Sequence, residues 1–378
     1  MTATLRTALL LLLLAPLPAR AGARTGSENT AKFEGFPYPI EAVLSGKASF
    51  ETGYSAPPAA RYDTVLLQGL MPDENVAVEI VVKPRSIFSS PAVYGQTAGR
   101  VYPNGRFWAK FRVPLTDQPF KVRVSAYPGR AARPGAAVVL YEAETAVESL
   151  SKEAPQEAEK PYVPDPALSL PADAPFKLIR RAEWGAELPK SSYTVHQPFF
   201  FTLHHTQGNY PATREAALSE IRFIQDYHQN AKGWIDIGYH FLIDPQGDIF
   251  EGRPIRAEGA HVLSHNTGNI GISIMGNYHP PVSNPITPAS MDSFVAIGRY
   301  LRDTYAVNVS SFYAHRDIGN TDCPGDNLYA LKGRLRDRIF ADAPQPQPLP
   351  QPLPQDAPPM TPAQQEALRK LTQYLETQ

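Results

Sequence analysis

The sequence predicts two folded domains of different class. An all-β, sandwich-like domain spans residues 34–147, and an α/β domain with a mixed central sheet flanked by helices spans residues 176–340. The first part holds short runs rich in β-branched and aromatic residues, separated by Pro, Gly, Asp and Asn. The second alternates strand-like with helix-like runs. Residues 148–175, which lie between them, are charged and proline-rich, as is typical of a linker.

Composition limits the partners. The 378 residues leave room for two domains and tails, and the 39 prolines cluster at the expected joints. The chain has 36 basic and 37 acidic residues, a formal net charge of -1, and no long basic block. We therefore expect neither nucleic acid nor an anionic membrane surface as a general partner.

The first 23 residues resemble a signal peptide. Arg6 precedes an apolar core, Ala8 to Leu14, which is followed by proline and small residues. This core is shorter than the roughly 20 residues that span a bilayer. We expect an exported protein without a membrane span, either periplasmic or secreted; a buried N-terminal helix is the alternative.

Five segments of the first domain read as strands, several with apolar residues at every second position. They are residues 62–70, 75–84, 106–115, 119–127 and 136–144. Their spacing predicts an antiparallel β-sandwich. Trp108 and Tyr94 either contact glycan from its surface or pack in its core. No catalytic constellation is recognisable in this domain, and its ligand is left open.

In the second domain, strands are expected at residues 199–205, 269–278 and 312–317, and a hairpin at 238–253. Helices are expected at residues 214–233 and 287–305 and towards residue 340, because apolar residues recur there at helical spacing. This order predicts a central sheet covered by helices.

A metal site is predicted around FYAHRDIGNTDCPG, residues 312–325. It contains His315 and Cys323, the only cysteine in the chain. Imidazole and thiolate donors suit Zn²⁺, whereas an unpaired thiol is a liability in an exported protein. The third ligand is expected from His204 or His205, of which a strand can present only one to a given side. The residues alone do not choose between these two histidines. For Cys323, the alternative to binding a metal is a buried structural role.

Several segments in order, RRAEWGA, FTLHHT, GWIDIGYHFLIDPQGDIFEGR, GAH, NIGISIMGNY and AHRDIGNTDCPG, resemble the peptidoglycan recognition protein and type 2 N-acetylmuramoyl-L-alanine amidase family. The resemblance covers about residues 176–340. It implies one Zn²⁺ held by His204, His315 and Cys323. It further implies that Tyr239 and Thr321 serve catalysis, Thr321 by positioning.

The same resemblance suggests substrate contacts at His261 and Asn266. His205 is expected to orient its strand or to line the rim of the groove. Arg256, together with Arg253, is a weaker hypothesis for binding a stem-peptide carboxylate. Framework roles are expected for Trp234, Asp236, Gly238, His228 and His240.

The implied reaction is zinc-dependent hydrolysis of the amide between N-acetylmuramic acid and L-alanine, with peptidoglycan or muropeptides as partners and the protein a monomer. The alternative is a binding module of the same fold that does not cut. Residues 341–378 complete the prediction with a Pro/Gln-rich tail and a short C-terminal helix.

Overall fold

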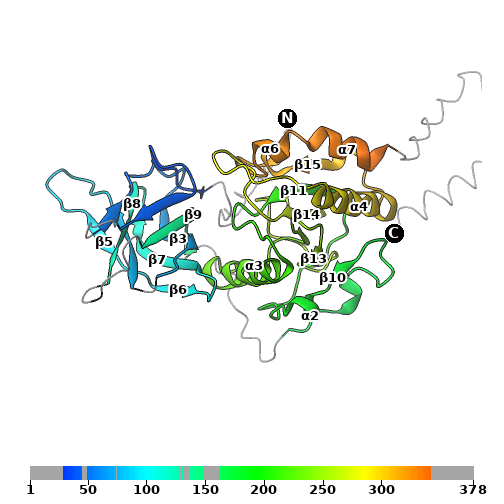
Figure 1. Ribbon diagram of the computed structural model, residues 1–378, viewed down its shortest axis with the longest axis horizontal. Helices are drawn as coiled ribbons and strands as arrows, with labels where there is room; N and C mark the ends of the chain where they lie inside the picture. The colour runs from blue at the N-terminus through cyan, green and yellow to red at the C-terminus, as the bar shows by residue number, and fades with distance from the viewer. Residues whose placement is uncertain are drawn as a thin grey trace, which may run out of the picture. The chain divides into compact units, whose positions relative to one another are not determined.

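Nine strands between Ile40 and Ala146 form two antiparallel sheets (Figure 1). The first sheet has the order β1 (Ile40–Val43), β9 (Ala137–Ala146), β3 (Tyr62–Leu70), β7 (Arg106–Thr116), β6 (Ala98–Val101). The second has the order β2 (Ser49–Glu51), β8 (Phe120–Ala126), β4 (Val76–Val82), β5 (Ala92–Tyr94). We call residues 29–148 the sandwich.

The computed structural model describes residues 29–44, 49–73, 75–127, 130, 136–148 and 162–341. The predicted signal peptide, residues 149–161 of the predicted linker and all but the first residue of the predicted tail lie outside these residues. Those described up to Phe340 belong to one compact unit.

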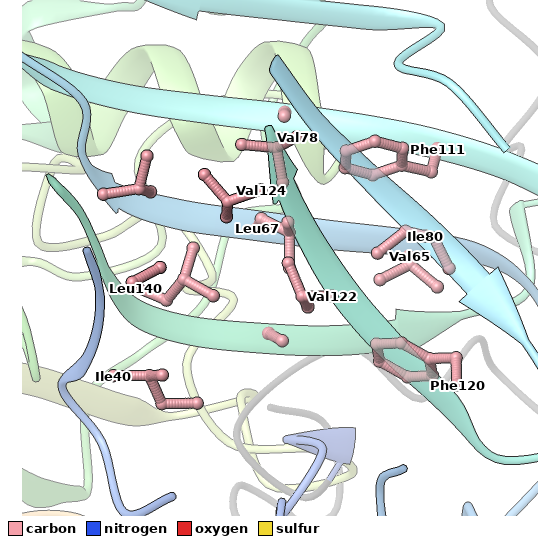
Figure 2. Close-up of a cluster of buried hydrophobic side chains, with 14 of the residues drawn as sticks. Ile40, Val65, Leu67, Val78, Ile80, Phe111, Phe120, Val122, Val124 and Leu140 are labelled. Atoms are coloured by element: carbon pink, nitrogen blue, oxygen red, sulfur yellow. The ribbon is translucent and has the colours of Figure 1, made fainter. Parts of the chain in front are cut away.

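The core of the sandwich lies between its two sheets. Figure 2 shows Val65 and Leu67 of β3 facing Ile80 of β4 and Val122 and Val124 of β8. Apolar residues alternate with more exposed ones along β4 and β8, which is the pattern expected of strands buried on one face. This alternation explains why the sequence predicted an all-β part.

A third, mixed sheet follows, with the order β10 (Leu178–Ile179), β13 (Ile249–Glu251), β12 (Phe241–Ile243), β14 (Asn269–Ile274), β11 (Phe200–His205), β15 (Phe312–Ala314). Only β12 and β13 pair antiparallel, as the predicted hairpin; the other neighbours are parallel. We call residues 162–341 the α/β region.

Helices cover both faces of this sheet (Figure 1). Helices α4 (Pro288–Tyr305) and α7 (Lys332–Phe340) pack on one face against the isoleucines of β14, and α3 (Arg214–Asp226) packs on the other. The remaining elements are η2 (Pro166–Leu168), α2 (Arg181–Trp184), η3 (Tyr227–Ala231), η4 (Val309–Ser311), α5 (His315–Ile318) and α6 (Asp326–Tyr329). The predicted fold class is confirmed for both parts.

Helix α3 is buried on two sides. Ile221 and Ile224 belong to a buried apolar cluster that also includes residues of the central sheet, and the same cluster includes Leu66 and Trp108 of the sandwich. The indole N–H of Trp108 donates a 2.5 Å hydrogen bond to Asp226. Trp108 therefore lies neither on the surface nor in the sandwich core, because the outer face of its sheet is covered by the α/β region.

The helix ends in a way that the sequence did not predict. Its α-helical part stops at Asp226, and Tyr227–Ala231 form a π-helical turn before Gly233, which has a φ of 75°.

Among the described residues, no helix is both long and apolar enough to cross a membrane.

Candidate metal and active site

The three predicted metal ligands lie together at the carboxyl ends of two neighbouring strands. His204 is the penultimate residue of β11, and His315 directly follows β15. The two strands run parallel and pair through Leu203 and Ala314, which brings the histidines side by side. Cys323 joins them from the loop before α6. Nitrogen or sulfur atoms of all three lie within 4.8 Å of one another.

These side chains fit a zinc ion in chemistry and in spacing. His204 Nδ1 lies 3.6 Å from Cys323 Sγ, which is about the separation of two ligands in a tetrahedral N/S zinc site. Burial lowers the pKa of His315 to about 4, so its ring is neutral and has a lone pair to donate. Burial also raises the pKa of Cys323 to about 12. A bound cation reverses that last effect, because it stabilises the thiolate.

A chain of hydrogen bonds sets the tautomer of His204. His261 Nε2 lies 3.2 Å from the carbonyl oxygen of Asn269, which can only accept, so this nitrogen carries the proton. In the neutral ring, His261 Nδ1 is then an acceptor and receives the Nε2–H of His204 across 3.0 Å. The lone pair of His204 is left on Nδ1, the atom that faces Cys323. This relay leaves the free lone pair of His204 on the side of the ring that faces the other two candidate ligands.

Two glycines make room for His261. A Cβ atom added to Gly271, on β14, would lie 2.7 Å from Cδ2 of the His261 ring, and one added to Gly259 would lie 2.6 Å from the same atom. Real Cβ atoms do not approach so closely. The glycines of GAH and NIGISI therefore form a notch that holds the imidazole. Sequence reasoning placed His261 among the substrate contacts, whereas the structure places it behind a predicted ligand.

The second histidine of the pair, His205, points elsewhere. Its Nδ1 accepts from the backbone N–H of Tyr278 across 3.3 Å, while its own backbone N–H donates to Cys323 Sγ across 3.4 Å. His205 Nε2 is buried and has no hydrogen-bond partner among the described residues. The alternation along β11 thus turns His204, and not His205, towards His315 and Cys323, and His204 is the histidine that the resemblance implied as a ligand.

Tyr239 stands over the cluster from the segment before β12. Its ring centroid lies 5.3 Å from that of His204 and 5.8 Å from that of His228. Burial raises the pKa of Tyr239, so the phenol keeps its proton at neutral pH. Tyr239, His205, His315 and Cys323 line one small cavity of about 80 Å³. The phenol is thus a hydrogen-bond donor beside the candidate metal site.

Thr321 does not line this cavity. Its hydroxyl accepts the backbone N–H of Cys323 across 3.0 Å, which fixes the loop that carries the thiol. It lines a second cavity instead, of about 460 Å³. The structure therefore associates Thr321 with the position of Cys323; its expected role in catalysis stays a prediction.

The predicted outer contacts lie away from the small cavity. Asn266 Oδ1 accepts the backbone N–H groups of His261 and Val262, each across 2.9 Å, and so shapes their loop. Arg253 is buried and donates to carbonyl oxygens of its own region, including that of Ile237 across 2.7 Å. Arg256 is exposed and lines neither cavity. The structure thus gives no support to a stem-peptide site at these arginines.

The expected framework residues are hydrogen-bonded within the α/β region. Asp236 forms an ion pair with Arg181 across 2.9 Å. The backbone N–H of Gly238 donates to His228 Nδ1 across 3.0 Å. His240 donates from Nε2 to the carbonyl of Ala257 across 2.8 Å. These contacts hold the segment that carries Tyr239.

Sequence reasoning missed a whole wall of the small cavity, because it comes from the sandwich. The wall consists of Gln68, Arg106, Glu142 and Glu144. Glu144 pairs with Lys232, and burial raises the pKa of Glu142 to about 8. A strand pattern shows which residues alternate, but not that the outer face of a sheet meets a second region. Charged residues on that face are equally typical of a face that meets solvent, so the sequence held no signal of the contact.

Comparison with known proteins finds relatives of the α/β region. A family model described as N-acetylmuramoyl-L-alanine amidase matches residues 194–326. Peptidoglycan-recognition protein SC2 of Drosophila melanogaster is 36% identical over 157 residues, covering 40% of this chain and 82% of the relative. Peptidoglycan recognition protein 1 of Bos taurus is 37% identical over 161 residues, covering 41% and 81%.

Among solved structures, wild-type Drosophila PGRP-LB is 28% identical, with a TM-score of 0.37, covering 41% of this chain and 91% of that one. N-acetylmuramoyl-L-alanine amidase LysC from Clostridium intestinale is 29% identical, with a TM-score of 0.33. The sequence relatives exceed 30% identity over most of their own length. The chain therefore belongs to the family of peptidoglycan recognition proteins and N-acetylmuramoyl-L-alanine amidases.

Proposed function

We propose that this protein is a zinc-dependent amidase that hydrolyses the bond between N-acetylmuramic acid and L-alanine in peptidoglycan. The observation that carries the proposal is the relay from Asn269 through His261 to His204, which directs a lone pair at the same point as His315 and Cys323. A site that serves packing alone has no need of a defined tautomer.

In this proposal His204, His315 and Cys323 hold Zn²⁺. When bound, the ion polarises the amide carbonyl and makes water a stronger nucleophile at neutral pH. The phenol of Tyr239 donates a hydrogen bond to the oxyanion that develops on the carbonyl. This hydrogen bond stabilises the transition state more than the ground state. The hydroxyl of Thr321 keeps Cys323 in place by accepting a hydrogen bond from the backbone N–H of Cys323.

The test is release of free stem peptide from muropeptides, followed by mass spectrometry, with zinc-loaded protein, chelated protein and Cys323→Ala in parallel. We expect release only from the zinc-loaded wild type. Tyr239→Phe should lower kcat about 100-fold or more, as expected when an oxyanion donor is lost. Tyr313→Phe, on β15 and outside the cavity, is the matched control. Muropeptide binding by zinc-loaded protein without release would instead favour a recognition module.

We also propose that the protein acts outside the cytoplasm and that Met1–Ala23 are removed on export. The mature protein then keeps both predicted domains, residues 34–147 and 176–340. N-terminal sequencing of protein recovered from the cell exterior or periplasm tests this proposal. An intact Met1 on the exported protein contradicts it.

A further inference from the structure

We propose that the segment Thr30–Tyr38 of the sandwich forms a glycan-binding site beside the metal centre, and that its ligand is the neutral N-acetylated amino-sugar part of the substrate. The inference rests on the proposed function. One wall of the site, the segment Thr30–Tyr38, lies outside the matched range 194–326, and the inference gives the sandwich a part in binding the substrate.

The site is the second cavity, between this segment and two loops of the α/β region. At about 460 Å³ it falls within the range of about 300–1,000 Å³ typical of ligand pockets. The small cavity, at about 80 Å³, does not. The two are neighbours, because Gln207 lines both and Thr321, in the larger one, holds the backbone of Cys323 in the smaller one. A ligand in the larger cavity thus lies next to the proposed point of cleavage.

The segment is held firmly to the sandwich. The backbone N–H of Ala31 donates to the carbonyl of Ala143 across 2.7 Å, and the Tyr38 hydroxyl donates to the carbonyl of Ala31 across 2.8 Å. Phe36 packs edge-on against Phe50, with ring centroids 5.9 Å apart. A wall fixed in this way binds with little ordering cost.

The chemistry of the lining favours sugar over peptide. Phe36 offers an aromatic surface to the apolar face of a pyranose ring, and the amide side chains of Gln207 and Asn277 can both donate and accept, as hydroxyl and acetamido groups require. The charges of Lys32 and Asp322 oppose each other across 3.4 Å. The small cavity is instead lined by charged side chains that already pair with one another, Arg106 with Glu220 and Lys232 with Glu144. The larger cavity therefore suits a neutral glycan better than the small cavity does.

Isothermal titration calorimetry of the full zinc-loaded chain tests the site with two probes, neutral di-N-acetylchitobiose and the free stem tripeptide. We expect Phe36→Ala to weaken the affinity for the disaccharide by about tenfold or more, as for a buried aromatic anchor. Phe36→Leu keeps apolar packing against Phe50 and should weaken it similarly. Phe88→Ala, a phenylalanine of the sandwich that is 94% exposed, should match the wild type.

Three results would overturn the inference: no disaccharide binding by the wild type at millimolar concentration, equal affinity in all variants, or a loss confined to the tripeptide. These measurements do not depend on turnover. Phe36-dependent disaccharide binding by a protein that releases no stem peptide supports the glycan site and contradicts the amidase. Turnover without Phe36-dependent binding does the reverse.

Discussion

Arg106 on β7 and Glu220 on α3 form a two-bonded ion pair, in which Nε and Nη2 of the arginine each lie 3.0 Å from a carboxylate oxygen. Both side chains are 1% exposed. Arg106 also donates to the carbonyl of Gly69 across 2.9 Å. The contact joins the sandwich to the α/β region where both line the small cavity. Its burial makes each charge dependent on the other.

Arg106→Met should therefore destabilise the protein by about 3–5 kcal/mol, because it leaves the carboxylate of Glu220 buried without its partner. Urea denaturation measures the change. Arg85→Met is the control, since its ion pair with Asp117 is exposed and is expected to contribute about 0–1 kcal/mol. Similar small losses in both variants would show that the buried pair does not couple the two regions.

His261→Ala should weaken zinc binding by about 10- to 100-fold, the usual effect of removing a group that orients a metal-bound histidine. Competition with a chromogenic chelator measures the dissociation constant. His265→Ala, an exposed histidine on the same loop, should bind zinc like the wild type. Wild-type affinity in His261→Ala would refute the relay.

Zinc should stabilise the folded protein by about 2.7 kcal/mol at a free concentration 100 times its dissociation constant, because the assembled site exists only in the folded state. Thermal unfolding with and without zinc measures the shift in Tm. We expect a chelator to reverse the shift and Cys323→Ala to abolish it. An undiminished shift in that variant would place the ion elsewhere.

The metal-free protein should lose stability as the pH falls. Burial lowers the pKa of His261 to about 3 and that of His315 to about 4, from an ordinary value of 6.5. The folded state therefore binds fewer protons than the unfolded one, so this stabilisation is complete above about pH 6.5 and declines towards pH 3–4. Urea midpoints at pH 7.5, 6 and 5, measured with a chelator present, follow the decline.

The double variant His261→Gln with His315→Gln is the control for this pH dependence. It should show a flatter dependence between pH 7.5 and 5, because two of the groups that resist protonation are gone. An unchanged slope would assign the dependence to other buried groups, such as His204, His228 and His240, whose pKa values burial also lowers.

The sequence predicted the secondary structure and the three grouped donors well, since both depend on local signals. Alternation along β8 is visible within its own seven residues, FKVRVSA, and the histidine pair, His315 and Cys323 stand out by type. The role of His261 was not predictable, because it depends on a carbonyl, two glycines and a histidine that meet only in the folded sheet. The same holds for Trp108, whose strand pattern is the same whether its face meets solvent or helix α3.

The space that Gly259 and Gly271 leave for His261 also limits which residues members of the family can have at these two positions. Gly259 and Gly271 touch no metal ligand, yet a single methyl group at either position would push the imidazole out of line and so disturb His204. Selection for the proposed metal site should therefore also act on these two positions, although neither lies where the substrate is expected to bind. In relatives without the three candidate ligands, residues larger than glycine are expected to be tolerated at both positions.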